Sequence, residues 1–482
     1  MTTNSTSSNQ RALLAVVVAI AVVAIGVRLF QLGTPNFWYD EAASLSYARD
    51  LSRFDVHPPT YYVTLTALLP FSTSEFVLRL SSTLAGLVAV AAVYFIGKDL
   101  FPGTTQLIAA LLVALSPMLV WHAQEARMYS QALAFSLLTV FFYLRIRRQG
   151  QTGNWIGYIV CALLAIYTHL YSAFIPFILT LHMLLFHRSL LRGWIIAHVI
   201  IALGYLPWVI VLINYPPKQI GTGRPFSVFN IFYTYYAFTT GYSLGPSVNE
   251  LRGLDLAVIR PYLLLIAPIG IVVGLLTVLG MVKQWRKDRN LAVLLILWAF
   301  APVIIAAVIP LLRPSMTFNA RYVIAALPAL IFIIAIGVSA LPRLPRLAAL
   351  VVLVFYSGLS LYNHYFDQRY AKEDVRAAAD YIETAAKPED TLLIITVGQV
   401  FDWYFDGSNR QVSTLSSQPL DMLIDEATQD SSIVWVVESR PWQTDPRGVV
   451  LQDFETNYRL LDEKSFTGVT VYRYCIQDCP VS

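Results

Sequence analysis

Charged side chains are scarce in this sequence of 482 residues. Asp, Glu, Lys and Arg together make up 13% of the chain, and the mean hydropathy is +0.58. Soluble globular domains carry about 25% charged residues, so this composition excludes a chain that faces water on all sides. No internal repeat is present, and low complexity is confined to the first ten residues.

Cysteine is also rare, and the three cysteines lack the spacing typical of a zinc site. Cys161 lies within an apolar run and is expected to serve packing. Cys475 and Cys479 lie in the C-terminal tail, where an oxidising compartment would allow them to pair. The tail also lacks a glycine-rich phosphate loop and a nucleophile elbow, so we expect it to support recognition of an acceptor and to carry no catalysis.

Long apolar runs, in contrast, recur from residue 12 to about residue 362. A membrane-spanning helix needs about 20 predominantly apolar residues. The sequence therefore predicts an α-helical polytopic membrane protein with about eleven transmembrane helices, followed by a small C-terminal α/β domain. The predicted spans are 12–32, 76–97, 104–121, 129–145, 154–171, 173–187, 193–213, 261–281, 291–312, 322–340 and 347–363.

Basic residues predict the orientation of these spans. Lys and Arg gather in every second loop, and short loops rich in Lys and Arg mark the cytoplasmic side. We expect a multi-pass protein of the plasma membrane with a cytoplasmic tail (1–11), a transmembrane domain (12–363) and an extracytoplasmic domain (364–482). A cleaved signal peptide is the alternative for the first span, but its length and the lack of a small-residue cleavage site favour a retained helix.

Two segments outside the predicted spans have recognisable patterns. The outer loop 33–74 is dense in ionisable groups and is predicted to form interfacial helices. In the tail, buried strands at 391–397 and 432–438 alternate with helical segments at 372–386 and 421–427, which predicts the α/β domain.

The outer loop 33–74 carries the densest set of candidate functional residues. Asp40 and Glu41 follow three aromatic residues that anchor the segment at the membrane interface, and Arg28 lies in the outer half of the first span. Ionisable groups at the edge of a membrane are candidates for function. Two interpretations are open: the carboxylates take part in catalysis, or they pair with Arg28, Arg49 or Arg53 or cap a helix that starts at Ala42.

These residues, in this order, resemble a known family. An Arg in the first span, an Asp-Glu pair, the HPP turn of FDVHPP (54–59) and Arg79 in the second span resemble the protein O-mannosyltransferase and aminoarabinose transferase group of the GT-C glycosyltransferases. Three further segments resemble this group, although it often has Trp at the position of Val375. They are SPMLVWHAQEARMYS (116–130), NARYVIAALPAL (319–330) and KEDVRAAADYI (372–382).

The resemblance implies transfer of a sugar from a polyprenyl-phosphate donor to a hydroxyl acceptor on the outer face of the membrane, usually with inversion. By motif position, Asp40 is the expected general base and Glu41 a structural or acceptor-positioning partner. The chemistry agrees, because a hydroxyl that attacks an anomeric carbon must lose its proton. The acceptor is a protein, a lipid or a glycan, and no nucleic-acid partner is expected.

The lipid phosphate leaves as an anion, so the donor site needs fixed positive charge. Arg79, Arg127 and Arg321 are the candidates, each near the outer end of a span. The alternatives are ion pairs of Arg79 with Glu75 and of Arg127 with Glu125, and interfacial snorkelling of Arg321.

Four further residues are expected to support the catalytic carboxylates or to contact the acceptor: Arg28, His57, Tyr129 and Tyr322. For Arg28 we favour a role in orienting Asp40. His57 precedes two prolines, and a histidine in such a turn more often bonds to the neighbouring backbone. No metal is required for a monophosphate donor if the arginines are well placed, although a divalent metal is compatible with the site.

Two other classes of protein compete with the glycosyltransferase. A transporter or flippase of a lipid-linked or anionic substrate would also need buried arginines and carboxylates. Here the charges gather in the outer loops, which favours chemistry at one surface. A non-enzymatic sensor or assembly protein would have no need of the residues in the first outer loop.

Overall fold

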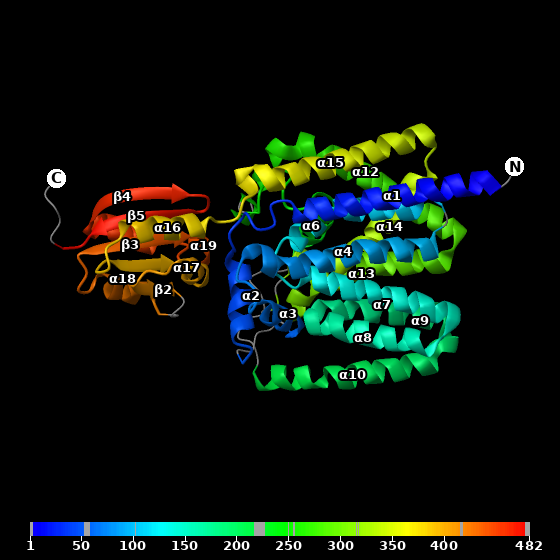
Figure 1. Cartoon of the computed structure of the whole chain (residues 1–482), viewed down its shortest axis with the longest axis horizontal. Helices are drawn as coiled ribbons and strands as arrows, with labels where there is room; N and C mark the ends of the chain where they lie inside the picture. The colour runs from blue at the N-terminus through cyan, green and yellow to red at the C-terminus, as the bar shows by residue number, and fades with distance from the viewer. Residues whose placement is uncertain are drawn as a thin grey trace. The chain divides into compact units, whose positions relative to one another are not determined.

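The structure is a computed structural model that describes residues 3–52, 58–101, 103–215, 227–248, 250–253, 256–314, 316, 318–414 and 418–477. The chain forms two compact units (Figure 1). Unit 1 comprises Met1–Leu32 and Leu51–Tyr370, and unit 2 comprises Gly33–Asp50 and Ala371–Ser482.

Unit 1 is helical, and its long helices lie side by side in Figure 1. The long helices are α1 (Thr3–Leu29), α4 (Glu75–Leu100), α7 (Tyr129–Gln149), α8 (Thr152–Thr168), α10 (Leu191–Asn214), α12 (Leu263–Lys287), α13 (Arg289–Leu312) and α15 (Arg343–Phe366). The shorter helices are α3 (Thr60–Leu68), α5 (Thr105–Leu115), α6 (Pro117–Ala123), α9 (Phe174–Phe186), α11 (Val228–Thr240) and α14 (Leu327–Ala340). Turns of 3-10 helix are η1 (Leu170–Ala173), η2 (Arg188–Leu190), η3 (Glu250–Gly253), η4 (Leu256–Tyr262), η5 (Ala320–Ala326) and η6 (Gln368–Tyr370).

The helices of unit 1 agree with the predicted spans. Among the described residues, eight helices are long and apolar enough to cross a membrane, or nine if the bent pair α5 and α6 is one span. The pair bends by 53° at the break before Pro117, whose missing N–H suits the first turn of α6. Two shorter apolar helices, Thr152–Thr168 and Leu170–Phe186, occupy the predicted spans 154–171 and 173–187. Every predicted span has a helical counterpart, so the predicted fold class is confirmed.

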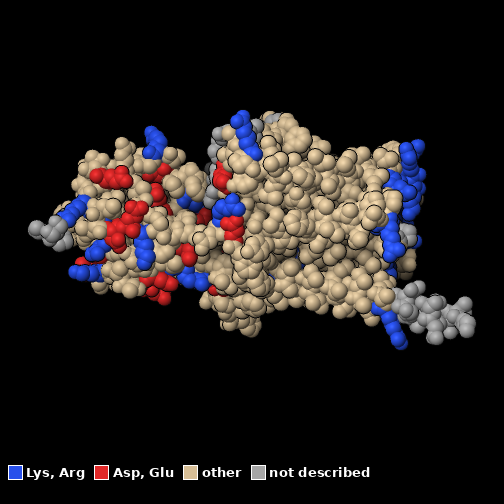
Figure 2. Space-filling view, turned by 90° about the horizontal axis from the view of Figure 1, so that it is seen from above, with Lys and Arg blue, Asp and Glu red and all other residues tan. Residues whose placement is uncertain are grey.

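The surface of unit 1 has the distribution of charge that a bilayer requires. In Figure 2 a broad band of this unit carries no charged side chains, and Lys and Arg gather beyond one end of the band. Large apolar side chains point outward along the helices, with Leu203 of α10 63% exposed and Phe355 of α15 61% exposed. Such side chains are stable on the outside of a helix when lipid is the solvent.

Close backbone contact holds the centre of unit 1 together. Helix α14 is buried on nearly every side, as expected for a helix that is apolar all round. It meets α12 where Gly280 lies against the carbonyl of Ile333 and Gly337 lies against the carbonyl of Leu276. A Cβ atom on Gly280 would lie 2.0 Å from the oxygen of Ile333, so only glycine allows this approach.

Unit 2 contains a five-stranded sheet with strand order β2-β1-β3-β5-β4. Strands β1, β2 and β3 are parallel, whereas β5 is antiparallel to both β3 and β4. Gly468, with a φ of 68°, forms the turn between β4 and β5. The strands are β1 (Thr391–Ile395), β2 (Arg410–Ser413), β3 (Ile433–Ser439), β4 (Arg459–Phe466) and β5 (Val469–Cys475).

Helices cover both faces of this sheet. One core lies beneath α16 and α17, and the other lies beneath α18 and α20. Burial on both faces explains why all five residues of β1 are buried, as is usual for a parallel strand. The predicted strands and helical segments are thus confirmed, whereas β2, β4 and β5 are additions to the prediction. The helices are α16 (Val375–Ala385), α17 (Gly398–Tyr404), α18 (Leu420–Thr428), α19 (Pro441–Thr444) and α20 (Val449–Asn457).

Unit 2 also contains α2 (Tyr39–Arg49), which is separated from the sheet by more than 300 residues of sequence. Ala42 of α2 belongs to the core that α16 and α17 form with the sheet. The prediction placed the whole loop 33–74 with the transmembrane helices and began the second domain at residue 364. The compact units do not follow this division of the chain, because the apolar face of α2 is buried in unit 2.

Candidate active site

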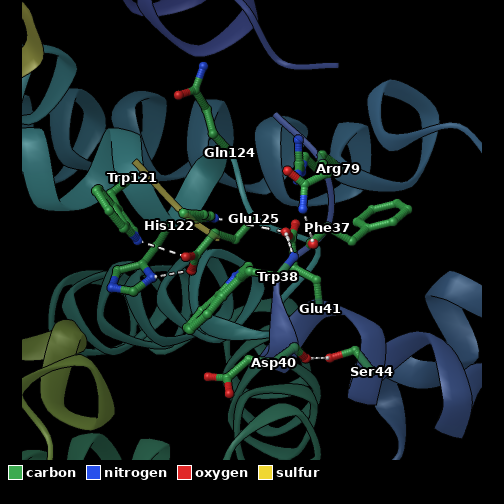
Figure 3. A network of polar contacts seen from close by, with 12 residues as sticks. Phe37, Trp38, Asp40, Glu41, Ser44, Arg79, Trp121, His122, Gln124 and Glu125 are labelled. Atoms are coloured by element: carbon green, nitrogen blue, oxygen red, sulfur yellow. Dashed lines mark hydrogen bonds and ion pairs between the residues drawn. The ribbon is translucent and has the colours of Figure 1, made fainter. Parts of the chain in front are cut away.

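The carboxylates Asp40 and Glu41 lie in the first turn of α2. This helix begins at Tyr39, three residues before the predicted start, and the backbone N–H of Trp38 donates to Oε2 of Glu41 over 3.3 Å (Figure 3). The positive end of the helix dipole stabilises acidic residues at this position. Glu41 is fully buried and Asp40 is half-buried. Glu41 therefore has a capping role, which is one of the two interpretations that the sequence left open.

Arg28 and Arg79 are fully buried in unit 1, and both donate to backbone carbonyl oxygens. The guanidinium of Arg28 donates to the oxygens of Ala114 over 2.8 Å and of Val113 over 3.2 Å, which joins α1 to the end of α5. Arg79 donates to the oxygen of Leu32 over 3.0 Å and fixes the chain where it leaves α1. These bonds give both arginines a structural role, and their roles toward Asp40 and the donor phosphate stay predictions.

The connection between α6 and α7, which carries Arg127, is fixed by α4. The hydroxyl of Ser82 donates to the carbonyl of Arg127 over 3.0 Å, and the hydroxyl of Thr83 donates to the carbonyl of Ala123 over 2.8 Å. The hydroxyls of Tyr61 and Ser82 form a further bond of 2.9 Å. Buried hydrogen bonds of this kind hold a loop in one conformation, so Arg127 is presented from a fixed backbone.

A capping bond places Arg321 in the same way. Asn319 precedes η5, and its side-chain oxygen accepts the backbone N–H of Arg321 over 3.2 Å. The indole N–H of Trp298 donates to the carbonyl of Ala325 over 2.7 Å at the other end of this turn. The sequence Asn-Ala-Arg-Tyr therefore sets the position of the arginine through an N-terminal cap.

Four of the predicted site residues belong to one connected group of ring contacts: Arg127, Tyr129, Arg321 and Tyr322. The guanidinium carbon of Arg127 lies 5.8 Å from the centre of the Tyr129 ring, and that of Arg321 lies 5.3 Å from it. The ring of His169 lies 5.7 Å from Tyr129 and 5.5 Å from Tyr322. These five residues are called the Tyr129 cluster here. Two cations on one buried aromatic ring form a region of positive potential that suits an anionic ligand.

A carboxylate that the prediction considered only as a partner of Arg127 lies beside this cluster. Glu125 is buried and accepts the indole N–H of Trp121 over 2.7 Å, and its other oxygen lies 3.0 Å from Nδ1 of His122 (Figure 3). The ring of His122 in turn lies 4.9 Å from the Tyr129 ring, tilted by 57°. The sequence could have indicated Glu125, because the segment Trp-His-Ala-Gln-Glu-Ala-Arg has many polar residues within an apolar chain.

Tyr242 is a second residue that was not among the predicted site residues. Its ring lies 5.5 Å from Trp121 and 5.8 Å from His122, and its buried hydroxyl has no hydrogen-bond partner among the described residues. Burial raises the pKa of Tyr242 well above its ordinary value, so the phenol keeps its proton. Buried donors are nearly always satisfied, and a ligand oxygen would satisfy this one.

Two expectations concern other parts of the site. His57 lies outside the described residues. Within the described part of the chain, His, Cys, Asp and Glu form no group of three that could hold a metal ion. Cys475 ends β5 and Cys479 lies outside the described residues, so their disulfide stays a prediction.

Comparison with known proteins supports the fold. Residues 56–213 match the family described as dolichyl-phosphate-mannose-protein mannosyltransferase. No curated protein matches the sequence. Two solved structures of ArnT from Cupriavidus metallidurans are similar, both with a TM-score of 0.64. The form bound to undecaprenyl phosphate is 13% identical over 95% of this chain and 97% of ArnT, and the apo form is 14% identical over 96% and 98%.

A third structure, the archaeal oligosaccharyltransferase AglB from Archaeoglobus fulgidus in complex with an inhibitory peptide and a dolichol-phosphate, has a TM-score of 0.53. It is 13% identical over 97% of this chain and 75% of AglB. The chain therefore shares its overall fold with ArnT and AglB. The family match over residues 56–213 agrees with the resemblance predicted from the sequence.

Proposed function

We propose that this protein is a membrane glycosyltransferase that transfers a sugar from a polyprenyl-phosphate donor to a hydroxyl acceptor. The observation that carries the proposal is the Tyr129 cluster, in which Arg127 and Arg321 approach one buried ring. The similar ArnT structure contains undecaprenyl phosphate and the AglB structure contains a dolichol-phosphate, so both neighbours bind lipid phosphates. A lipid phosphate is the anion that two arginines at a membrane suit best.

Each group has one task in the proposed reaction. Arg127 and Arg321 bind the phosphate of the donor, and the hydroxyl of Tyr242 donates to one of its oxygens. Asp40 accepts the proton of the acceptor hydroxyl as its oxygen forms a bond to the anomeric carbon. The bond from that carbon to the phosphate oxygen breaks, and polyprenyl phosphate leaves with the electron pair. Attack opposite the leaving group inverts the anomeric configuration.

The basic residues support the orientation that we propose for the chain. In this proposal the N-terminus lies in the cytoplasm, and unit 2 lies outside, because Lys and Arg gather at the helix ends predicted to be cytoplasmic. The acceptor is a protein, a lipid or a glycan of the cell envelope. The reaction requires no metal in this proposal, because the two guanidinium groups compensate the charge of a monophosphate.

The test is a transfer assay on the purified full chain with radiolabelled polyprenyl-phosphate sugars. Wild type is compared with Asp40→Asn and with Asp50→Asn, which removes a carboxylate at the opposite end of α2. Loss of a general base lowers a rate by about 100- to 10,000-fold, so this loss is expected for Asp40→Asn alone. The anomeric configuration of the product, measured by NMR, tests inversion.

Each outcome has a clear meaning. Release of polyprenyl phosphate together with a labelled product identifies a transferase and its sugar. Equal rates for wild type and Asp40→Asn would remove Asp40 as the base. Movement of the intact labelled lipid across vesicles, with no cleavage of its sugar–phosphate bond, would identify a flippase and refute the proposal.

A further inference from the structure

The segment that carries the carboxylates is part of the fold of unit 2. Ala42 is buried in the core that α16 and α17 cover. The backbone N–H of Phe37 donates to the hydroxyl of Tyr404 over 2.6 Å, and the Phe37 ring meets the edge of Trp403 at 5.5 Å. The guanidinium of Arg49, at the end of α2, lies 3.9 Å from the Trp403 ring. Helix α2 is therefore attached to α17 at both of its ends.

A buried ion pair fixes the start of this segment. Nε of Arg440 donates to Oε1 of Glu373 over 2.6 Å, and both side chains are about nine-tenths buried. The backbone carbonyl of Glu373 accepts the side-chain amide of Asn36 over 2.8 Å. The guanidinium of Arg440 also lies 5.3 Å from the Trp38 ring and 5.6 Å from the Tyr39 ring. Arg440 thus links the end of β3 to the two residues that precede Asp40.

The conformation of Arg440 indicates that its position is constrained. It follows β3 directly and has a φ of 50°, in the left-handed region that non-glycine residues seldom adopt. Its carbonyl accepts the hydroxyl of Thr396 over 3.5 Å at the end of β1. The carboxyl ends of parallel strands are where open α/β sheets hold their ligands. In this unit that edge holds the segment before α2.

A second cation reaches the catalytic helix from the same unit. Nζ of Lys372 lies 3.8 Å from Oε2 of Glu41, which is fully buried. The same ammonium group lies 5.1 Å from the Trp38 ring, so Trp38 is contacted by both Lys372 and Arg440. Trp38 and Glu41 also form the capping bond of α2. Both cations therefore act on the residues that determine where the first turn of α2 lies.

We infer that Arg440, Glu373 and Lys372 are positioning residues for the carboxylates of α2, so that the C-terminal unit sets the turnover rate of the enzyme. This inference rests on the proposed function. Misplacement of a catalytic group by about 1 Å can lower a rate by about 100-fold. Loss of Arg440 leaves Glu373 as a buried carboxylate without its guanidinium, which forces the segment to rearrange. The effect falls on kcat, because the donor-binding arginines belong to unit 1.

The experiment compares Arg440→Ala, Arg440→Lys and Glu373→Gln with wild type in the full chain. The matched control is Arg410→Ala, which removes an arginine that bonds the carbonyls of Glu426 and Gln429 at β2. Two quantities are measured: kcat and KM for a polyprenyl-phosphate sugar, and hydrogen exchange of the amides of α2. Arg440→Lys keeps the charge but loses the planar fork, so partial rescue is expected.

Support consists of three results together. Arg440→Ala lowers kcat by about 10- to 100-fold with donor KM changed less than about 3-fold, speeds exchange in α2, and is partly rescued by Arg440→Lys. Arg410→Ala changes none of these. Unchanged exchange in α2, or unchanged kcat, would overturn the inference. If Arg440→Ala fails to fold, Arg440→Lys and Glu373→Gln supply the same comparison.

Failure of the proposed function gives a different result. If wild type transfers no sugar from any donor, exchange in α2 still reports on the three residues, because it needs no activity. Faster exchange in Arg440→Ala would then support the positioning role, and the lack of transfer would count against the proposed function alone. Exchange equal to that of wild type would refute the positioning itself.

Discussion

Substitution of Arg321 by Lys or Ala is expected to weaken binding of the donor. Arg321 is held at the start of η5 by the side chain of Asn319, and its guanidinium lies 5.3 Å from the Tyr129 ring and 5.9 Å from the Tyr322 ring. Its position is therefore set by the backbone and by two aromatic neighbours. Removal of the guanidinium should affect a bound anion more than the fold around it.

The expected size of the effect follows from the strength of one charged hydrogen bond. A hydrogen bond to an ionised group contributes about 1.5 to 3 kcal/mol. Since each 1.4 kcal/mol is a factor of ten, the Kd for a polyprenyl phosphate should rise by about 10- to 140-fold in Arg321→Ala. Arg321→Lys keeps the charge and loses the planar fork, so the lower end of this range is expected for it.

The assay is a calorimetric titration of the detergent-solubilised protein with a polyprenyl phosphate. The matched control is Arg313→Ala, which removes an exposed arginine at the end of α13. Thermal unfolding of each variant without ligand shows whether the fold is intact. An unchanged Kd for Arg321→Ala in a folded protein would refute the assignment of the Tyr129 cluster as the donor site. A change of equal size in Arg313→Ala would show a general effect of surface charge.

Three further predictions concern packing, pH and metal. Gly280→Ala should destabilise unit 1 by about 1 to 3 kcal/mol, because the new Cβ atom clashes with the carbonyl of Ile333. Gly274→Ala is the control, because a Cβ atom there meets open space. Equal thermal midpoints for the two variants would contradict the prediction. Burial raises the folded-state pKa of Glu438, so the folded state binds the proton more tightly. The stability that protonated Glu438 contributes is fully present below the ordinary pKa of 4.5 and is lost as pH rises through the pKa of the folded state. Glu438→Gln should therefore slow hydrogen exchange in β3 relative to wild type at pH 7, and the two proteins should exchange alike at pH 4. A difference at pH 4 alone would contradict the predicted direction of the pKa shift. Treatment with EDTA should leave transfer unchanged, and loss of transfer with recovery on adding a divalent metal would show that one is required.

The long apolar runs were sufficient to predict the helices of unit 1, because each run must satisfy its own backbone inside a bilayer. The buried strands β1 and β3 were also predictable, since both are continuous apolar runs. Strand β4 was missed because it is an exposed edge with no apolar alternation, and it is stabilised by its pairing with β5. A strand of this kind depends on a partner that the local sequence does not reveal.

The sequence by itself determined the helical class, the positions of the apolar segments and the identity of most candidate site residues, because burial in lipid and costly ionisable groups leave a local signal. Tertiary structure decided which of these residues meet. It placed Arg127 and Arg321 on one tyrosine ring and attached α2 to the C-terminal sheet through Arg440. Such contacts join segments up to 400 residues apart, and their geometry depends on packing that no single segment encodes.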